Sequence, residues 1–169
     1  YFYNPDIDYI IGSTHYMGDW GVDNPAEISR YNERDIDDIY KDYFALVEAL
    51  VDAKFCDIVG HFDLIKKFGH RPKCGMSPVY RRIAKKMSAN GIAAEINTSG
   101  LRKPVHEIYP SDEIINILFQ ENVPVTLGSD SHSPDDVCSG YPPAIEKLKS
   151  IGYRKISGFT KRKRHELLL

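Results

Sequence analysis

GIAAEINTSG, residues 91–100, is the stretch of sequence that decides the fold. Its first part, residues 91–96, is short and almost entirely apolar, which is typical of a strand covered on both faces in a parallel sheet. Its second part, residues 97–100, is polar and ends in a glycine. We predict a buried strand that delivers polar side chains to its carboxyl end.

A helical pattern lies on each side of this strand. Residues 77–90 begin with a Ser-Pro pair, repeat apolar residues at helical spacing and stop at an Asn-Gly pair. A second helix is predicted to begin at Ser111 and to end before Pro124, which cannot continue it. A buried strand between two amphipathic helices indicates an α/β fold.

The same alternation extends along the whole chain. Residues 35–54 and 143–150 predict two more helices. Further short apolar runs predict strands at residues 9–12, 56–60, 123–128 and 153–157. The order is β-α-β-α-β-α-β-α-β within one domain, residues 1–169. Right-handed crossovers then give an α/β barrel or an open doubly wound sheet. A closed eight-stranded barrel takes roughly 200 residues or more, so we expect an open sheet or a barrel without its first strands.

Polar side chains follow each of the first four predicted strands, and those carboxyl ends share one edge of a parallel sheet. They are His15, His61, Glu95 with Asn97, and Asp130 with His132. Imidazole and carboxylate together suit divalent metals such as zinc, manganese or iron. A single histidine after a strand is more often a surface residue, but three histidines and an aspartate at equivalent strand ends favour a metal site.

Two loops at this edge are cationic. They contribute Lys66, Lys67, Arg71 and Lys73 after the second strand, and Arg102 and Lys103 after the third. A metal site ringed by cations fits a phosphate ester, because the transition state of phosphoryl transfer needs its charge neutralised. Arg102 is the strongest candidate, since the turn at Gly100 could aim it inward and a guanidinium binds phosphate through two hydrogen bonds. Lys73 and Lys103 are interpreted as solvated charges.

Other catalytic classes lack their motifs. The chain contains no G-x-S-x-G serine elbow and no P-loop, and Cys56 falls within an apolar strand. Water activated by a metal is therefore the nucleophile that the sequence offers.

The composition of the chain limits the classes of partner that we expect it to bind. The net charge is −2 at pH 7, which argues against a nucleic-acid partner, and no apolar run approaches membrane length. Three cysteines without a C-x-x-C pair favour reduced thiols in a cytoplasmic protein. We expect a small-molecule ligand.

Four stretches of this chain resemble the PHP superfamily (polymerase and histidinol-phosphatase), and within it the monofunctional histidinol-phosphatases. They are DYIIGSTHY at 8–16, DIVGHFDLIKKF at 57–68, AAEINTSGLRKPVHEIYPS at 93–111 and VTLGSDSHSPDDV at 125–137. The resemblance implies a distorted, seven-stranded βα barrel of the TIM type with a cluster of metals at the strand ends.

The resemblance also implies roles for the residues that match its motifs. His15, His61, Asp130 and His132 correspond to metal ligands, and His132 could also act near the leaving group. Arg102 with Lys66 or Lys67 would hold the substrate phosphate, and Glu95 and Asn97 would support the ligands from behind. The family's first strand carries an H-x-H motif, followed by a further histidine and a bridging glutamate, and this chain shows none of them. We therefore expect an incomplete barrel, whose open edge would allow two copies of the chain to associate.

The activity implied is hydrolysis of L-histidinol phosphate to L-histidinol and phosphate, a step of histidine biosynthesis. Two alternatives stay open. The chain could act as another phosphoesterase or exonuclease of the superfamily, or it could be a catalytically inactive fragment or pseudoenzyme, because the ligands of the first strand are absent.

Overall fold

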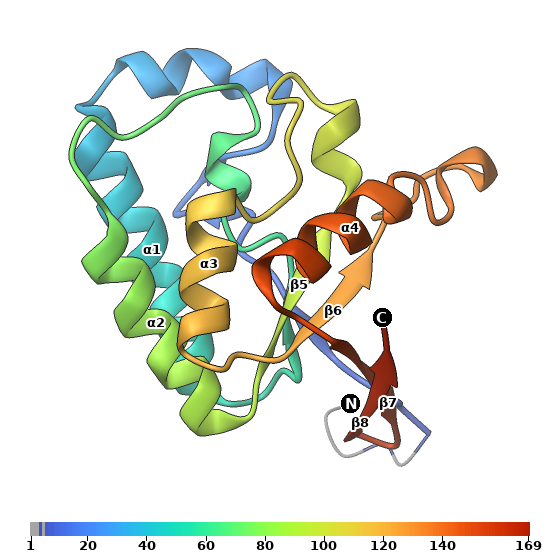
Figure 1. Ribbon diagram of the computed structural model, residues 1–169. Helices are drawn as coiled ribbons and strands as arrows, with labels where there is room; N and C mark the ends of the chain where they lie inside the picture. Colours follow the sequence, from blue (N-terminus) through green and yellow to red (C-terminus); the bar gives the residue numbers. More distant parts are fainter. Residues whose placement is uncertain (1–3, 5) are drawn as a thin grey trace.

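The computed structural model describes residue 4 and residues 6–169. Its centre is a four-stranded parallel sheet in the order β1-β4-β5-β6 (Figure 1). The strands are β1 (Ile11–Gly12), β4 (Ile58–Val59), β5 (Ala93–Asn97) and β6 (Val125–Gly128). All four run in one direction, so their carboxyl ends meet at the same edge. The prediction of four parallel strands is confirmed, but only β4 and β5 are buried along their whole length, because Ile11 of β1 is exposed and three residues of β6 are half-buried.

Within this sheet, each strand pairs with the sheet strand that follows it in sequence. The connections therefore all run in the same direction across the sheet. The helices are α1 (Ile36–Ala53), α2 (Ser77–Asn90), α3 (Asp112–Gln120) and α4 (Tyr141–Ile151). Helix α2 packs between α1 and α3 (Figure 1). A doubly wound sheet would reverse the direction of strand addition, and this sheet does not. Among the described strands, β1 and β6 are the two edges, so the sheet is open.

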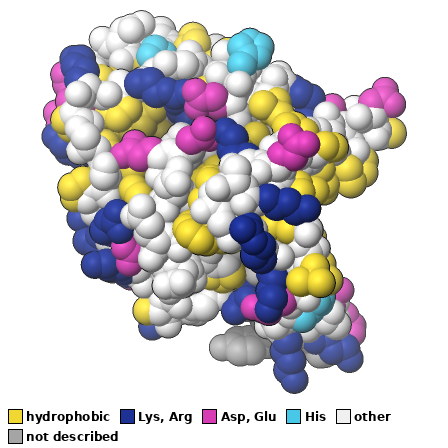
Figure 2. Space-filling model, viewed as in Figure 1, with side chains coloured by type: hydrophobic (Ala, Val, Ile, Leu, Met, Phe, Trp, Pro, Cys, Tyr) yellow, Lys and Arg dark blue, Asp and Glu magenta, His cyan; other side chains and the backbone are white. Residues whose placement is uncertain are grey.

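The fifth predicted strand joins a different sheet. Strand β7 (Lys155–Thr160) pairs antiparallel with β8 (Lys163–Leu168), so the prediction that it continues the parallel sheet is wrong. The two residues between these strands, Lys161 and Arg162, both have positive φ, as a tight hairpin turn requires. The local turn therefore supplies β7 with its hydrogen-bonding partner. Figure 2 shows Lys and Arg side chains gathered over this hairpin.

Short elements that the sequence pattern did not predict connect the larger ones. A small antiparallel hairpin, β2 (Tyr16–Met17) with β3 (Trp20–Gly21), follows β1. Four 3-10 helices are η1 (Pro25–Asn32), η2 (Leu64–Lys66), η3 (Ser99–Arg102) and η4 (Pro134–Asp136). Three of these, η2, η3 and η4, come directly after β4, β5 and β6, so they shape the edge where the strands end.

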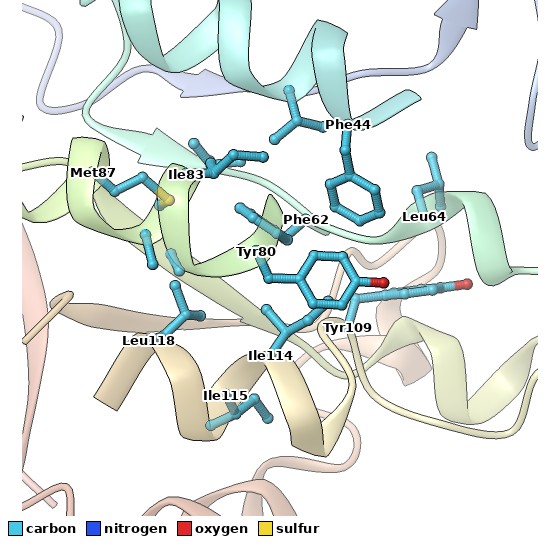
Figure 3. Packing of buried hydrophobic residues seen from close by; sticks show 14 of the residues in the cluster. Phe44, Phe62, Leu64, Tyr80, Ile83, Met87, Tyr109, Ile114, Ile115 and Leu118 are labelled. Atoms are coloured by element: carbon cyan, nitrogen blue, oxygen red, sulfur yellow. The ribbon is translucent and has the colours of Figure 1, made fainter. Parts of the chain in front are cut away.

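The main core lies between the sheet and helices α1 to α3 (Figure 3). Phe44 of α1 is fully buried at its centre. Its ring lies edge-on to Tyr80 of α2, with 4.8 Å between ring centroids, and 5.6 Å from Phe62, which follows β4. One side chain thus joins two helices to the sheet. No helix in the described part of the chain combines the length and the apolar character needed to cross a membrane.

Replacing Phe44 with alanine tests this packing. Phe44→Ala is expected to lower the free energy of unfolding by about 3–5 kcal/mol, because a large buried ring leaves a cavity that cannot fully collapse. The control is Leu46→Ala in the same helix, where the side chain is 40% exposed and the expected loss is below about 0.5 kcal/mol. Urea titrations followed by circular dichroism measure both, and equal losses would contradict this description of the core.

Candidate functional site

A pocket of about 370 Å³ lies at the carboxyl edge of the sheet. The residues lining it that were predicted from the sequence are His15, His61, Lys67, Glu95, Asn97, Asp130 and His132. They come from the segments that follow β1, β4 and β6 and from β5 itself, as the parallel direction of the strands requires. A larger pocket of about 710 Å³ lies among the helix starts and is lined by none of the predicted metal ligands.

Two histidines meet in this pocket. The ring centroids of His15 and His61 are 4.7 Å apart, with the rings at 82° to each other. His61 is buried, and its Nδ1 has no hydrogen-bond partner among the described residues. Burial, with a smaller contribution from the charge of His15, lowers the pKa of His61 to about 4. His61 is therefore neutral at pH 7, which is the form of imidazole that binds a metal.

Asp23 orients the other imidazole. The Nδ1 atom of His15 lies 3.3 Å from Oδ1 of Asp23. The hydrogen bond to Asp23 raises the pKa of His15, and the same bond lowers the pKa of Asp23 to about 2. Lys67 completes the group, since its Nζ donates to the backbone oxygen of Asp23 at 2.6 Å and lies 3.5 Å from Oδ2. Sequence reasoning missed Asp23, because it follows the small β2–β3 hairpin that no periodic pattern predicts.

Glu95 and Asn97 line the pocket beside His61, and their role in supporting metal ligands stays a prediction. Oε2 of Glu95 accepts a hydrogen bond from the backbone N–H of His61 at 2.9 Å and another from Nδ2 of Asn97 at 2.9 Å. Burial is the main cause that raises the pKa of Glu95. The side chain thus links the end of β4 to β5 beneath the pocket.

Asp130 and His132 enter the pocket from the segment after β6. Oδ2 of Asp130 accepts a hydrogen bond from Oγ of Ser99 at 3.2 Å, and the Asp130 backbone has a φ of 48°. The side chain of His132 is 80% exposed, and its Nδ1 lies 3.0 Å from the backbone oxygen of Asp130. Asp130 is therefore held in place, whereas His132 stands at the mouth of the pocket.

The donor atoms suit a divalent metal in type but not in number. Imidazole nitrogens and a carboxylate are the expected ligands, and the buried Nδ1 of His61 lacks a protein partner. Among the residues that the structure describes, however, no group of three or more His, Cys, Asp or Glu side chains is arranged to hold a metal ion. The pocket therefore offers donor atoms of suitable type, but the described residues do not form a complete ligand set.

Two predicted phosphate ligands lie outside this pocket, for physical reasons that the sequence did not reveal. Lys66 is 1% exposed. Its Nζ contacts Asp63 Oδ2 at 3.0 Å and Ile108 O at 2.8 Å, and it lines the larger pocket. Arg102 donates from NH2 to the backbone oxygen of Ser129 at 2.7 Å.

The Nε atom of Arg102 also pairs with Asp136 at 3.1 Å. Both predicted cations are thus held by internal partners and do not line the pocket of the histidines. Lys103, which the sequence suggested was only a solvated charge, lines that pocket instead.

Removing the charge of Asp23 tests the pairing with His15. Asp23→Asn is expected to lower the pKa of His15 toward its ordinary value of 6.5, because a neutral amide no longer stabilises the imidazolium. NMR titration of the histidine ring protons measures the change. The control is Asp19→Asn, which removes an exposed carboxylate paired with Arg30 and should leave His15 unchanged. An unaltered His15 pKa in the Asp23 variant would show that the two side chains are not paired in solution.

Several curated relatives cover most of this chain, and two of them represent higher and lower identity. One is a Deinococcus radiodurans protein named "Probable histidinol-phosphatase", which is 42% identical over 153 residues. That alignment covers 90% of this chain and 58% of the relative. The other is the histidinol-phosphatase of Bacillus subtilis, which is 27% identical over 164 residues, covering 86% of this chain and 60% of the relative. The chain thus spans somewhat over half the length of these relatives. No family model matches the sequence.

A solved structure has the same fold. It is the histidinol phosphate phosphatase of Lactococcus lactis, crystallised with zinc, L-histidinol and phosphate. The TM-score is 0.74 at 18% sequence identity, and the alignment covers 96% of this chain and 63% of that one. In sequence and in fold, therefore, this chain is similar to histidinol-phosphatases.

Proposed function

We propose that this chain contributes to a metal-dependent phosphomonoester hydrolase that converts L-histidinol phosphate and water to L-histidinol and phosphate. The observation that carries the proposal is the meeting of His15, His61 and Asp130 with two lysines, Lys67 and Lys103, in one pocket. Curated relatives that bear the name histidinol-phosphatase support it. So does the neighbouring fold whose crystals hold zinc, L-histidinol and phosphate together.

His15, His61 and Asp130 would hold the metal, with His132 able to join them from the mouth of the pocket. Zinc, manganese and iron all suit this donor set. When bound, such an ion supplies Lewis acidity toward a phosphoryl oxygen and toward water. Since the described residues form only part of a site, we propose that further ligands complete it.

The other side chains position and neutralise the substrate. Lys67 and Lys103 would attract the phosphate, because a charge-assisted hydrogen bond is about twice as strong as a neutral one. Asp23 holds both Lys67 and His15, so one carboxylate fixes a phosphate-binding cation relative to a metal ligand. Arg102 supports the segment after β6 from behind through Ser129 and Asp136, rather than contacting phosphate.

His132 is suited to the leaving group. Its imidazole is 80% exposed at the mouth of the pocket, where a departing alcohol would pass. An imidazole at this place could donate a proton to the alkoxide oxygen as the bond to phosphorus breaks.

We also propose that the sheet is a segment of a βα barrel. The sequential strand order, the packing of α2 between α1 and α3, and the polar pocket at the carboxyl edge are features of that architecture. In the described part of the chain, β1 and β6 each pair with one other strand of this sheet. Either edge could therefore accept a further strand.

One observation favours a second candidate, in which the chain binds ligands without turnover. No three donor side chains in the described part of the chain are arranged around one point. Zinc stoichiometry measured by mass spectrometry under native conditions, beside a phosphate-release assay, separates the two. Bound zinc without phosphate release would favour the binding-only candidate.

Substitution of Lys67 tests the proposed activity. Lys67→Ala is expected to raise the KM for L-histidinol phosphate about ten-fold or more, because a charge-assisted hydrogen bond of about 1.5–3 kcal/mol is lost. Lys85→Ala, on the exposed surface of α2, is the matched control and should leave KM unchanged. Arg102→Ala should change KM less than Lys67→Ala does. A larger effect at Arg102 would restore it as the phosphate ligand.

A further inference from the structure

Only one of the two carboxylate oxygens of Glu95 accepts hydrogen bonds from the protein. Glu95 lies in the middle of β5, is 7% exposed and lines the pocket. Both of its hydrogen bonds, from the N–H of His61 and from Asn97, go to Oε2. Oε1 has no hydrogen-bond partner in the described part of the chain, and it is not sealed from solvent. One carboxylate oxygen of Glu95, a residue that lines the pocket, is therefore left without a hydrogen bond from the described residues.

Glu95 also lacks a counter-charge. Among the described residues, no Lys, Arg or His side chain acts on it as a cation, whereas Asp130 adds a repelling negative charge. The nearby cation Lys67 is already matched by Asp23. Buried carboxylates are normally paired with a cation or a metal, because an isolated buried charge is costly. The missing positive charge is therefore expected to come from a ligand.

The neighbouring strands leave space for this carboxylate. A Cβ atom at Gly128 of β6 would lie 2.0 Å from Oε1 of Glu95, which is impossible without displacing it. A Cβ atom at Gly60, just after β4, would lie 3.4 Å from Oε2 and 2.5 Å from Oγ of Ser13. Glycine at position 128 thus leaves room for the Glu95 carboxylate, whereas Gly60 is required mainly by Ser13 and Ile11. Such an arrangement indicates a site for binding rather than for stability.

We propose that Oε1 of Glu95 binds the primary ammonium group of the substrate, an inference that rests on the proposed function. L-Histidinol phosphate is an aminoalkyl phosphate, with a phosphate ester at one end of a short chain and an ammonium group beside it. The pocket has a matching distribution of charge, with Lys67 and Lys103 for the phosphate and Glu95 for the ammonium. Glu95 thus selects aminoalkyl phosphates over phosphomonoesters that lack an amine.

The test measures binding of the alcohol product to the 169-residue chain by isothermal titration calorimetry. The ligands are L-histidinol and 3-(imidazol-4-yl)propan-1-ol, which is the same molecule without the amine. Glu95→Gln is compared with the parent chain and with Glu146→Gln, a matched change at an exposed position of α4. Glu95→Asp keeps the carboxylate on a side chain that is one methylene shorter. It is a control for weaker binding that results only from misfolding. Two-dimensional amide NMR spectra establish that each variant is folded.

The expected result is a rise of about ten-fold or more in the Kd of L-histidinol for Glu95→Gln, a smaller rise for Glu95→Asp and none for Glu146→Gln. The analogue without the amine should bind all four chains alike. Equal binding of both ligands to the parent chain, or no binding of L-histidinol to it, would overturn the proposal.

A metal could supply the same positive charge, so the chains are also titrated with Zn²⁺ alone. If Glu95→Gln weakened Zn²⁺ binding and weakened both organic ligands equally, Glu95 would be a metal ligand and the proposal would fail. Phosphate release from L-histidinol phosphate is measured separately. Its absence would count against the proposed function and leave the amine comparison valid, whereas turnover without discrimination at Glu95 would count against this inference alone.

Discussion

The hydrogen bond from the backbone N–H of His61 to Glu95 joins the two central strands where the pocket begins. Strands β1 and β4 are each only two residues long, so backbone pairing along them is brief. The Glu95 bond, at 2.9 Å, extends the contact between β4 and β5 past the last paired residue and fixes His61 over the sheet. His61 in turn lies against His15, which follows β1. The geometry of three strand ends therefore depends on one buried carboxylate.

The pKa values of His15 and His61 are shifted in opposite directions, although the two rings are in contact. Burial keeps His61 neutral, and the proximity of His15 lowers its pKa further. Asp23 favours the charged form of His15. Two imidazolium ions at 4.7 Å would repel, so placing the carboxylate beside only one ring separates their behaviour. The pocket thus holds one neutral imidazole, that of His61, and one imidazole, that of His15, whose Nδ1 faces the Asp23 carboxylate.

The sequence predicted the larger elements because their periodicity is set by burial. The four parallel strands and four helices were identified, and α1 and α2 closely so, because long apolar stripes with clear ends leave little choice. The β7–β8 hairpin was not predicted, since its pairing depends on two non-glycine residues at positive φ, Lys161 and Arg162. The residue types at the strand ends also predicted that the imidazoles of His15 and His61 lie close together. Sequence could not show which cations were already held, because Lys66 contacts the backbone oxygen of Ile108 and Arg102 pairs with Asp136, both far away in the chain.

The space that one buried side chain occupies also restricts which residues the neighbouring strand can carry. Glu95 and Gly128 lie on adjacent strands, and the glutamate occupies the space that a Cβ atom at position 128 would need. A lineage that replaced the glutamate with a small residue would be released from the need for glycine at position 128, and a lineage that acquired a side chain there would have to give up the glutamate. Positions 95 and 128 should therefore change together during evolution, as a single inherited unit rather than as two independent ones.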